Sequence, residues 1–209
     1  MFKRLVYFFS IMISMYGCDP DTDSLCSDDL DLNYILLSSP SNVPLMIIPE
    51  NNPTTEEGAN LGRHLFYDPI LSSDNTVSCN SCHKQENGFS DPSQYSFGVN
   101  QEIGERHAPT IINPGWQLFF DWDGKANSLE EQAARPILND IELHNMSWVE
   151  VVNRLESSNL YIDLFCQAFG VEQIDSSYIV MALAQFQRTL VSSNSRFDQW
   201  LNGQVLFTN

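Results

Sequence analysis

Positive charge is scarce in this 209-residue chain, which has 10 lysine and arginine residues against 27 aspartate and glutamate residues. The formal net charge of -17 at pH 7 argues against nucleic acid as a partner, because binding a phosphate backbone needs a cationic surface. Aspartates are dense between Asp19 and Asp31. A calcium loop there is one interpretation, but the segment lacks the glycine and the closing glutamate of an EF-hand. We expect residues 18–43 to be an acidic, disordered tether.

A long hydrophobic run is also missing. The apolar stretch from Leu5 to Tyr16 follows the basic segment Met1-Phe2-Lys3-Arg4 and is too short to cross a bilayer comfortably. This pattern predicts a secretory signal peptide over residues 1–17. The sequence Met15-Tyr16-Gly17-Cys18 resembles a bacterial lipoprotein cleavage site, which would leave Cys18 as the lipidated first residue. The alternative is an ordinary signal peptide with Cys18 there by chance. We expect a protein of the periplasm or cell envelope, anchored to a membrane by lipid.

Cysteine is limited to five residues, and a single pair has the Cys-x-x-Cys spacing. This pair forms Cys79-Asn80-Ser81-Cys82-His83, which is the attachment pattern of c-type haem. Each thiol can add to one vinyl group of haem, and the adjacent imidazole can ligate the iron. Zinc or dithiol chemistry is the alternative, but no second Cys-x-x-Cys is present, and the other histidines are scattered. We predict one covalently bound haem held by Cys79, Cys82 and His83.

Two cysteines, Cys26 and Cys166, are assigned neither to haem nor to lipid. A disulfide between them is possible in an oxidising compartment. Cys166 lies within an apolar helical pattern, so we favour a small buried hydrophobic residue instead.

No segment alternates clearly between apolar and polar residues, so half-buried β-strands are not indicated. Helical patterns are frequent instead. Capping boxes begin at Thr54, Ser128 and Ser147, and Gly170 is predicted to end the helix before it. The segment from Gln85 to Gly115 is rich in glycine, proline, asparagine and serine, which predicts a long ordered loop region around the cofactor. We predict a mainly α-helical haem domain over residues 44–209.

Methionine is absent between Met46 and Met146. A haem iron with a sulfur or imidazole ligand on both faces transfers electrons, whereas an open face lets peroxide or oxygen bind. The loop region therefore does not offer the usual methionine partner of a small electron-transfer cytochrome.

Several motifs follow one another along the chain. They are Leu61-Gly62-Arg63-His64-Leu65-Phe66-Tyr67-Asp68, Ser78 to His83, Ala108-Pro109-Thr110 with Asn113, Trp122 to Ala126, Ser128 to Gln132, Asn139 to Glu142, Ala182 to Leu190, and Phe197 to Gly203. Together they resemble the bacterial di-haem cytochrome c peroxidases. The resemblance implies an all-α, class I c-type cytochrome-like fold with long ordered loops. It covers the N-terminal, peroxidatic haem domain of the family, while a second Cys-x-x-Cys-His motif is absent.

The resemblance also implies roles for three further residues. Glu142 matches the acidic residue over the open face of the haem, where a base can move a proton between the two oxygens of peroxide. Its apolar sequence neighbours, Ile141 and Leu143 among them, could raise its pKa. Gln132 matches an amide that hydrogen-bonds peroxide, and Trp122 matches an aromatic residue between the two haems that relays electrons. Without the resemblance, these would be a solvated loop carboxylate, a helix-surface amide and a packing residue.

Two positions depart from the family pattern. Val99 stands where many relatives place a histidine that blocks the iron, sixteen residues after the proximal ligand, so we expect an open iron without prior activation. His107 stands where relatives supply an asparagine to a calcium site, so calcium is not expected to be a firm cofactor.

The resemblance implies reduction of hydrogen peroxide to water, with electrons from a small protein such as a cytochrome c or a cupredoxin. An alternative is a one-haem electron-transfer or redox-sensing domain without catalysis. A relative of the methylamine-utilisation haem proteins and a gene remnant are two further readings, neither favoured by the sequence.

Overall fold

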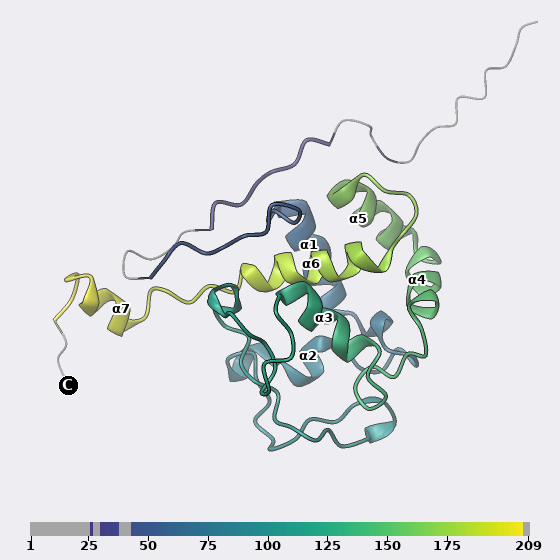
Figure 1. Ribbon diagram of the computed structural model, residues 1–209, viewed down its shortest axis with the longest axis horizontal. Coiled ribbons are helices and arrows are strands. Elements are labelled where there is room, and N and C mark those ends of the chain that lie inside the picture. The colour runs from purple at the N-terminus through teal and green to yellow at the C-terminus, as the bar shows by residue number, and fades with distance from the viewer. Residues whose placement is uncertain (1–25, 27–29, 38–42, 207–209) are drawn as a thin grey trace, which may run out of the picture.

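In the computed structural model, which describes residue 26 and residues 30–37 and 43–206, the chain consists of α-helices joined by long loops (Figure 1). The helices are α1 (Glu56–Tyr67), α2 (Cys79–Cys82), α3 (Leu129–Ile137), α4 (Trp148–Glu156), α5 (Asn159–Phe169), α6 (Ser176–Arg188) and α7 (Arg196–Leu201). Four short 3₁₀ turns, η1 (Pro69–Leu71), η2 (Gln85–Asn87), η3 (Val99–Gln101) and η4 (Pro114–Trp116), interrupt the loops. Within the described residues only isolated β-bridges occur and no strand. The predicted all-α architecture is confirmed.

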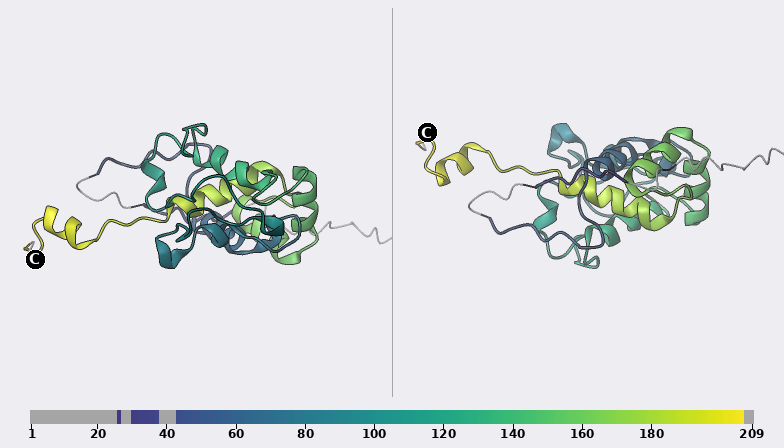
Figure 2. Two further views of the ribbon diagram at one scale, coloured as in Figure 1. Left: turned by 90° about the horizontal axis from the view of Figure 1, so that it is seen from below. Right: turned by 90° about the horizontal axis from the view of Figure 1, so that it is seen from above.

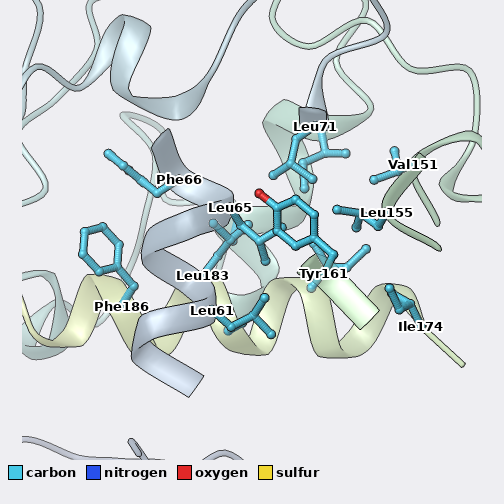
Figure 3. Packing of buried hydrophobic residues seen from close by; sticks show 14 of the residues in the cluster. Leu61, Leu65, Phe66, Leu71, Val151, Leu155, Tyr161, Ile174, Leu183 and Phe186 are labelled. Atoms are coloured by element: carbon cyan, nitrogen blue, oxygen red, sulfur yellow. The ribbon is translucent and has the colours of Figure 1, made fainter. Parts of the chain in front are cut away.

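Helices α1 and α6 lie against each other at the centre of the domain, with α5 and α3 packed beside them (Figure 1). Their apolar faces meet in one core, shown in Figure 3, where Leu61, Leu65 and Phe66 of α1 approach Leu183 and Phe186 of α6. Removing these side chains from water is the main favourable term in folding. Ile179, one turn before Leu183 on α6, belongs to the same core.

Close approach of α1 and α6 depends on glycine. A Cβ atom built on Gly62 would lie 1.9 Å from the backbone oxygen of Ala182, which is far too close for two non-bonded atoms. The two helix backbones touch at this point, and only a residue without a side chain fits between them.

Replacing Gly62 by alanine is therefore expected to destabilise the domain by about 1–3 kcal/mol, because the helices must separate to admit the methyl group. Chemical denaturation of the folded protein would measure this. Asn60→Ala, at an exposed position of the same helix, is the control and should change stability by less than about 0.5 kcal/mol. Equal stability of the Gly62→Ala protein and the wild type would contradict the close packing.

The first helix begins one residue later than the sequence predicts. Thr55, rather than Thr54, is the N-cap, and its hydroxyl accepts a hydrogen bond from the N–H of Gly58 at 3.0 Å. The Glu57 carboxylate, expected to complete a capping box with Thr54, instead accepts bonds from Asn33, at 3.1 Å from its N–H and 2.7 Å from its side chain. The other predicted starts, Ser128 and Ser147, are the N-caps of α3 and α4.

The segment before α1 corrects two predictions. Cys26 forms a disulfide with Cys166 of α5, so Cys166 is not the free hydrophobic residue that we favoured. Asn33 and Ile35 also bind the start of the domain, since the N–H of Ile35 donates to the carbonyl of Thr54 at 2.9 Å. The disordered tether predicted over 18–43 therefore does not extend through residues 30–37. The apolar helical pattern around Cys166 gave no sign of this distant partner.

Two predictions concern residues 1–18 at the N-terminus. The predicted signal peptide over residues 1–17 and the lipid-bearing Cys18 lie outside the described residues. Among the residues that are described, no helix combines the length and the apolar character needed to cross a membrane.

A buried polar network fixes α3 against α6. The guanidinium of Arg188, 3% exposed, pairs with the carboxylate of Glu130, which also accepts a bond of 2.6 Å from the Asn52 side chain. Gln185 joins the same network by donating to Asn52 at 2.8 Å. Burial acts to raise the pKa of Glu130, but the Asn52 bond and the Arg188 charge outweigh it, and the pKa is lowered. Helix α3, which contains the predicted site residue Gln132, is thus held in a fixed position.

After α6 the chain leaves the helical body. Residues 189–195 lead to α7, which projects away from the other helices in all three views (Figures 1 and 2). Phe197 and Trp200 of α7 stack with ring centroids 5.7 Å apart, while both remain largely exposed.

Candidate functional site

The Cys-x-x-Cys-His motif forms a single helical turn, α2, which follows the buried loop residue Val77. The N–H of Ser78 donates to the hydroxyl of Ser81 at 3.0 Å, and the N–H of His83 donates to the carbonyl of Cys79 at 2.9 Å. These bonds close the turn and place both thiols beside the imidazole. Cys79 and Cys82 form no disulfide.

The orientation of His83 is fixed by the loop that follows it. Its Nδ1 lies 3.1 Å from the carbonyl oxygen of Phe89, which places the proton of the neutral ring on Nδ1 and leaves Nε2 unprotonated. Burial lowers the pKa of His83, while hydrogen bonds to the backbone of Phe89 and Pro109 oppose this effect. A neutral imidazole with a free Nε2 is the form that ligates a metal.

The pKa values of both thiols are raised, whereas reactive cysteines have lowered pKa values. Burial, with smaller contributions from Cys82 and Glu142, raises the pKa of Cys79 to about 12. Burial also raises the pKa of Cys82. Dithiol redox catalysis and zinc binding both need thiolates, which this environment disfavours. No group of three or more His, Cys, Asp or Glu side chains among the described residues could hold a metal ion. The zinc and dithiol alternatives lose support.

A cavity of about 1030 Å³ lies beside the motif, at the upper end of the range of ligand sites. A smaller cavity of about 80 Å³ is lined by some of the same residues. Cys82, His83, Gln132 and Glu142 line both, Cys79 lines the smaller, and Trp122 lines the larger. The structure thus brings together every predicted haem-domain site residue. Phe66, Val77, Leu143 and Leu183 make the smaller cavity largely apolar.

Glu142 lies on the loop between α3 and α4 and is exposed to the cavity. Desolvation by the surrounding protein, with the nearby charge of Asp121, raises its pKa, and the charge of Arg135 lowers it in part. The predicted direction of the pKa shift is confirmed. No hydrogen bond or ion pair of the Glu142 carboxylate is found within the described part of the chain. The group is therefore free to act on a molecule in the cavity.

Gln132 and Trp122 approach the cavity from different elements. Gln132 is on α3, and its side chain lines the cavity rather than an outer helix surface. Trp122 is 64% exposed and donates from Nε1 to the carbonyl oxygen of His107 at 2.7 Å. Its ring is therefore fixed at the boundary between the cavity and solvent.

The two positions that depart from the family pattern are both in ordered loops. Val99 is 2% exposed and packs in the main core, so its side chain is not a ligand. The Nε2 of His107 lies 2.9 Å from the backbone oxygen of Asp91, so this ring is bonded to the loop that follows the Cys-x-x-Cys-His motif.

Sequence reasoning missed Gln187. This side chain on α6 is 6% exposed and lines both cavities, with no hydrogen bond to another described side chain. Its position four residues after Leu183, on an otherwise apolar stripe, was the available clue. Its amide is therefore available to bond to a group held in the cavity.

These residues fit a covalently attached haem. One cavity is surrounded by two thiols outside any disulfide, one imidazole with an unprotonated Nε2, apolar walls and the Gln187 side chain. Cys79 and Cys82 would hold the group and His83 would ligate its iron.

A family model described as di-haem cytochrome c peroxidase matches residues 56–205. The chain belongs to this family. The methylamine utilization protein MauG of Methylorubrum extorquens is 43% identical to this chain over 188 residues, which make up 90% of this chain and 52% of that protein. The cytochrome c peroxidase Ccp of Escherichia coli is 37% identical over 166 residues, 78% of this chain and 35% of that protein.

A solved structure of a MauG-like protein associated with microbial copper homeostasis superposes with a TM-score of 0.74 at 34% identity, covering 82% of this chain and 52% of that one. The present chain thus spans about half, or less, of the length of the peroxidase-family relatives that it matches. The sequence contains one haem attachment motif, whereas the family description names two haems.

Proposed function

We propose that this protein is an exported haem domain that reduces hydrogen peroxide to water. The observation that carries the proposal is the shared cavity, where Glu142 and Gln132 face the same space as His83 and the attachment cysteines. Membership of the peroxidase family supports the same chemistry.

Haem, when bound, would supply an iron that takes up electrons and binds an oxygen of the substrate. The protein would contribute the proton transfers. In its carboxylate form Glu142 can accept the proton of one peroxide oxygen and return it to the other, so that the departing oxygen leaves as water. Gln132 can donate a hydrogen bond from its amide and orient the peroxide. Each turnover needs two electrons from outside the cavity.

We further propose that a small redox protein, such as a cytochrome c or a cupredoxin, supplies these electrons. Trp122 is a candidate relay because it lines the cavity and is exposed to solvent. With one haem in this chain, the second electron would come from a side chain, from the porphyrin or from a partner. We expect slower turnover than in a two-haem enzyme.

Export and lipid anchoring at Cys18 remain part of the proposal. The Cys26–Cys166 disulfide supports an oxidising compartment, and the sequence around Cys18 supports lipidation. Mass spectrometry of the membrane fraction would detect the lipid on the N-terminal peptide. A Cys18→Ser protein should appear in the soluble periplasmic fraction instead.

The test of the function is optical and electron-paramagnetic-resonance spectroscopy of the oxidised haem-loaded protein, before and after one equivalent of hydrogen peroxide. A high-spin iron whose spectrum changes rapidly on adding peroxide supports the proposal. A low-spin, six-coordinate iron that does not react with peroxide would refute the proposal. It would favour the alternative, an electron-transfer or redox-sensing domain without catalysis.

The raised pKa of Glu142 predicts a pH dependence. Only the deprotonated carboxylate accepts a proton, and a raised pKa keeps the group protonated to a higher pH. The rate of reaction with peroxide should therefore fall on acidification with a midpoint above the ordinary value of 4.5. Arg135→Gln should move this midpoint upward, because the arginine lowers the pKa of Glu142. Arg106→Gln, on the same cavity wall, is the control and should leave it in place.

A further inference from the structure

The orientation of the Glu142 carboxylate is set by the backbone of this residue alone. None of its oxygens has a partner among the described side chains, whereas both of its backbone polar groups are bonded. Its N–H donates to the side-chain oxygen of Asn139 at 3.1 Å, and its carbonyl accepts from the N–H of Val99 at 3.1 Å. Whatever fixes this backbone also decides where the carboxylate points.

Asn139 makes the first of these two restraints. Its Oδ1 accepts from the N–H of Ile141 at 2.9 Å as well as from that of Glu142, which forms a tight turn directly before the acid. Its own carbonyl accepts from the N–H of His144 at 2.9 Å, on the far side of Glu142. One exposed asparagine thus bonds to the backbone on both sides of the carboxylate.

The second restraint comes from the Gly98–Val99 segment. A Cβ atom on Gly98 would lie 1.8 Å from the carbonyl oxygen of Ile141 and 2.9 Å from that of Glu142. Gly98 has φ -94° and ψ -159°, a backbone conformation that any residue can adopt. Glycine is therefore needed here because a side chain would clash with the carbonyl groups of Ile141 and Glu142. The backbone of this segment therefore lies directly against the loop that holds Glu142.

The far end of the loop is fixed independently. The side chain of Asn145, 3% exposed, donates to the carbonyls of Leu71 and Ile137, each at 2.8 Å. Asn139 is exposed and has no such core contacts, so changing it should leave this end, and the fold, in place.

We propose that Asn139 is a positioning residue for Glu142, holding the carboxylate over the cavity through two backbone hydrogen bonds and together with the Gly98 contact. This inference rests on the proposed peroxide chemistry only for the role of the acid. A catalytic group that is misplaced by about 1 Å can lose a hundredfold in rate, so a side chain with no contact to the substrate can control the reaction.

The test compares Asn139→Ala, Asn139→Asp and Glu142→Gln in the haem-loaded protein. Asn139→Ala should slow the reaction with peroxide by about ten- to a hundredfold at an unchanged melting temperature. Asn139→Asp keeps a side-chain oxygen that can accept both backbone hydrogen bonds and should restore most of the rate. Asn127→Ala, an exposed asparagine before α3 that does not line the cavity, is the control and should have no effect.

Non-additivity distinguishes positioning from general loosening. If Asn139 acts through Glu142, then Asn139→Ala should cost nothing further in a Glu142→Gln background. Additive losses would overturn the proposal. Gly98→Ala disturbs the same carboxylate through a different contact and should show the same non-additivity where the variant folds.

Cyanide binding supplies a readout that does not depend on turnover. Hydrogen cyanide must lose its proton to bind iron, so its association rate, followed optically, should fall in Glu142→Gln and in Asn139→Ala. A wild-type protein inert to peroxide would refute the proposed function, and the cyanide rates would still decide the positioning role. Peroxide and cyanide rates of Asn139→Ala equal to those of the wild type would refute the positioning role alone.

Discussion

Replacing both Cys79 and Cys82 by alanine is expected to abolish covalent haem attachment completely. Among the described cysteines, these two line the cavity beside His83, and they form no disulfide. Without them no thioether can form, and the haem can be held only by His83 and apolar contacts. The measurement is the mass of the purified polypeptide, together with haem staining after denaturing electrophoresis.

The matched control changes the other pair of cysteines. Cys26→Ser with Cys166→Ser removes the disulfide, which lies on α5 and the N-terminal segment, and should leave the haem mass intact. Covalent haem that persists in the Cys79→Ala, Cys82→Ala protein would show that the motif has been misassigned. Replacement of one cysteine should leave a single thioether and a haem that is retained in part.

Glu142→Gln is expected to lower the rate constant for reaction with hydrogen peroxide by about 10²–10⁴-fold, the range for loss of a general base. Glutamine keeps the size and polarity of the side chain but cannot take up the proton at any pH. The acid limb of the pH profile should disappear together with the rate. Stopped-flow spectroscopy at several pH values would measure both.

Glu105→Gln is the control for this variant. Glu105 is another carboxylate on the wall of the same cavity, exposed like Glu142. Its replacement should change the rate less than about twofold, because the exposed charge of Glu105 is screened by water and salt. A Glu142→Gln protein that reacts as fast as wild type would assign the proton transfer to another group.

Local sequence patterns predicted most helices because the information lies within a few residues. Ser128 caps α3 through a bond to the N–H of Glu131, three residues away, and Gly170 ends α5 with φ +66°. Thr54 shows the limit of this reasoning. Its capping box failed because Glu57 binds Asn33, 24 residues earlier, and no local pattern reports such a partner.

The same limit applies to the site. The family pattern identified Glu142 and Gln132, but it could not show that the Glu142 carboxylate lacks any described side-chain partner. It also missed Gln187, whose polar group becomes significant only because α6 turns it into the cavity.

The candidate acid came from the family resemblance, whereas the sequence by itself determined the cofactor motif, the helical class of the domain and the excess of negative charge. Each depends on residue identity or on spacing along a few turns of chain. The tertiary structure alone decided the Cys26–Cys166 disulfide, separated by 140 residues, and the contact of Gly98 with the loop around Glu142. These depend on the packing of distant segments, where distance in space is not set by distance along the chain.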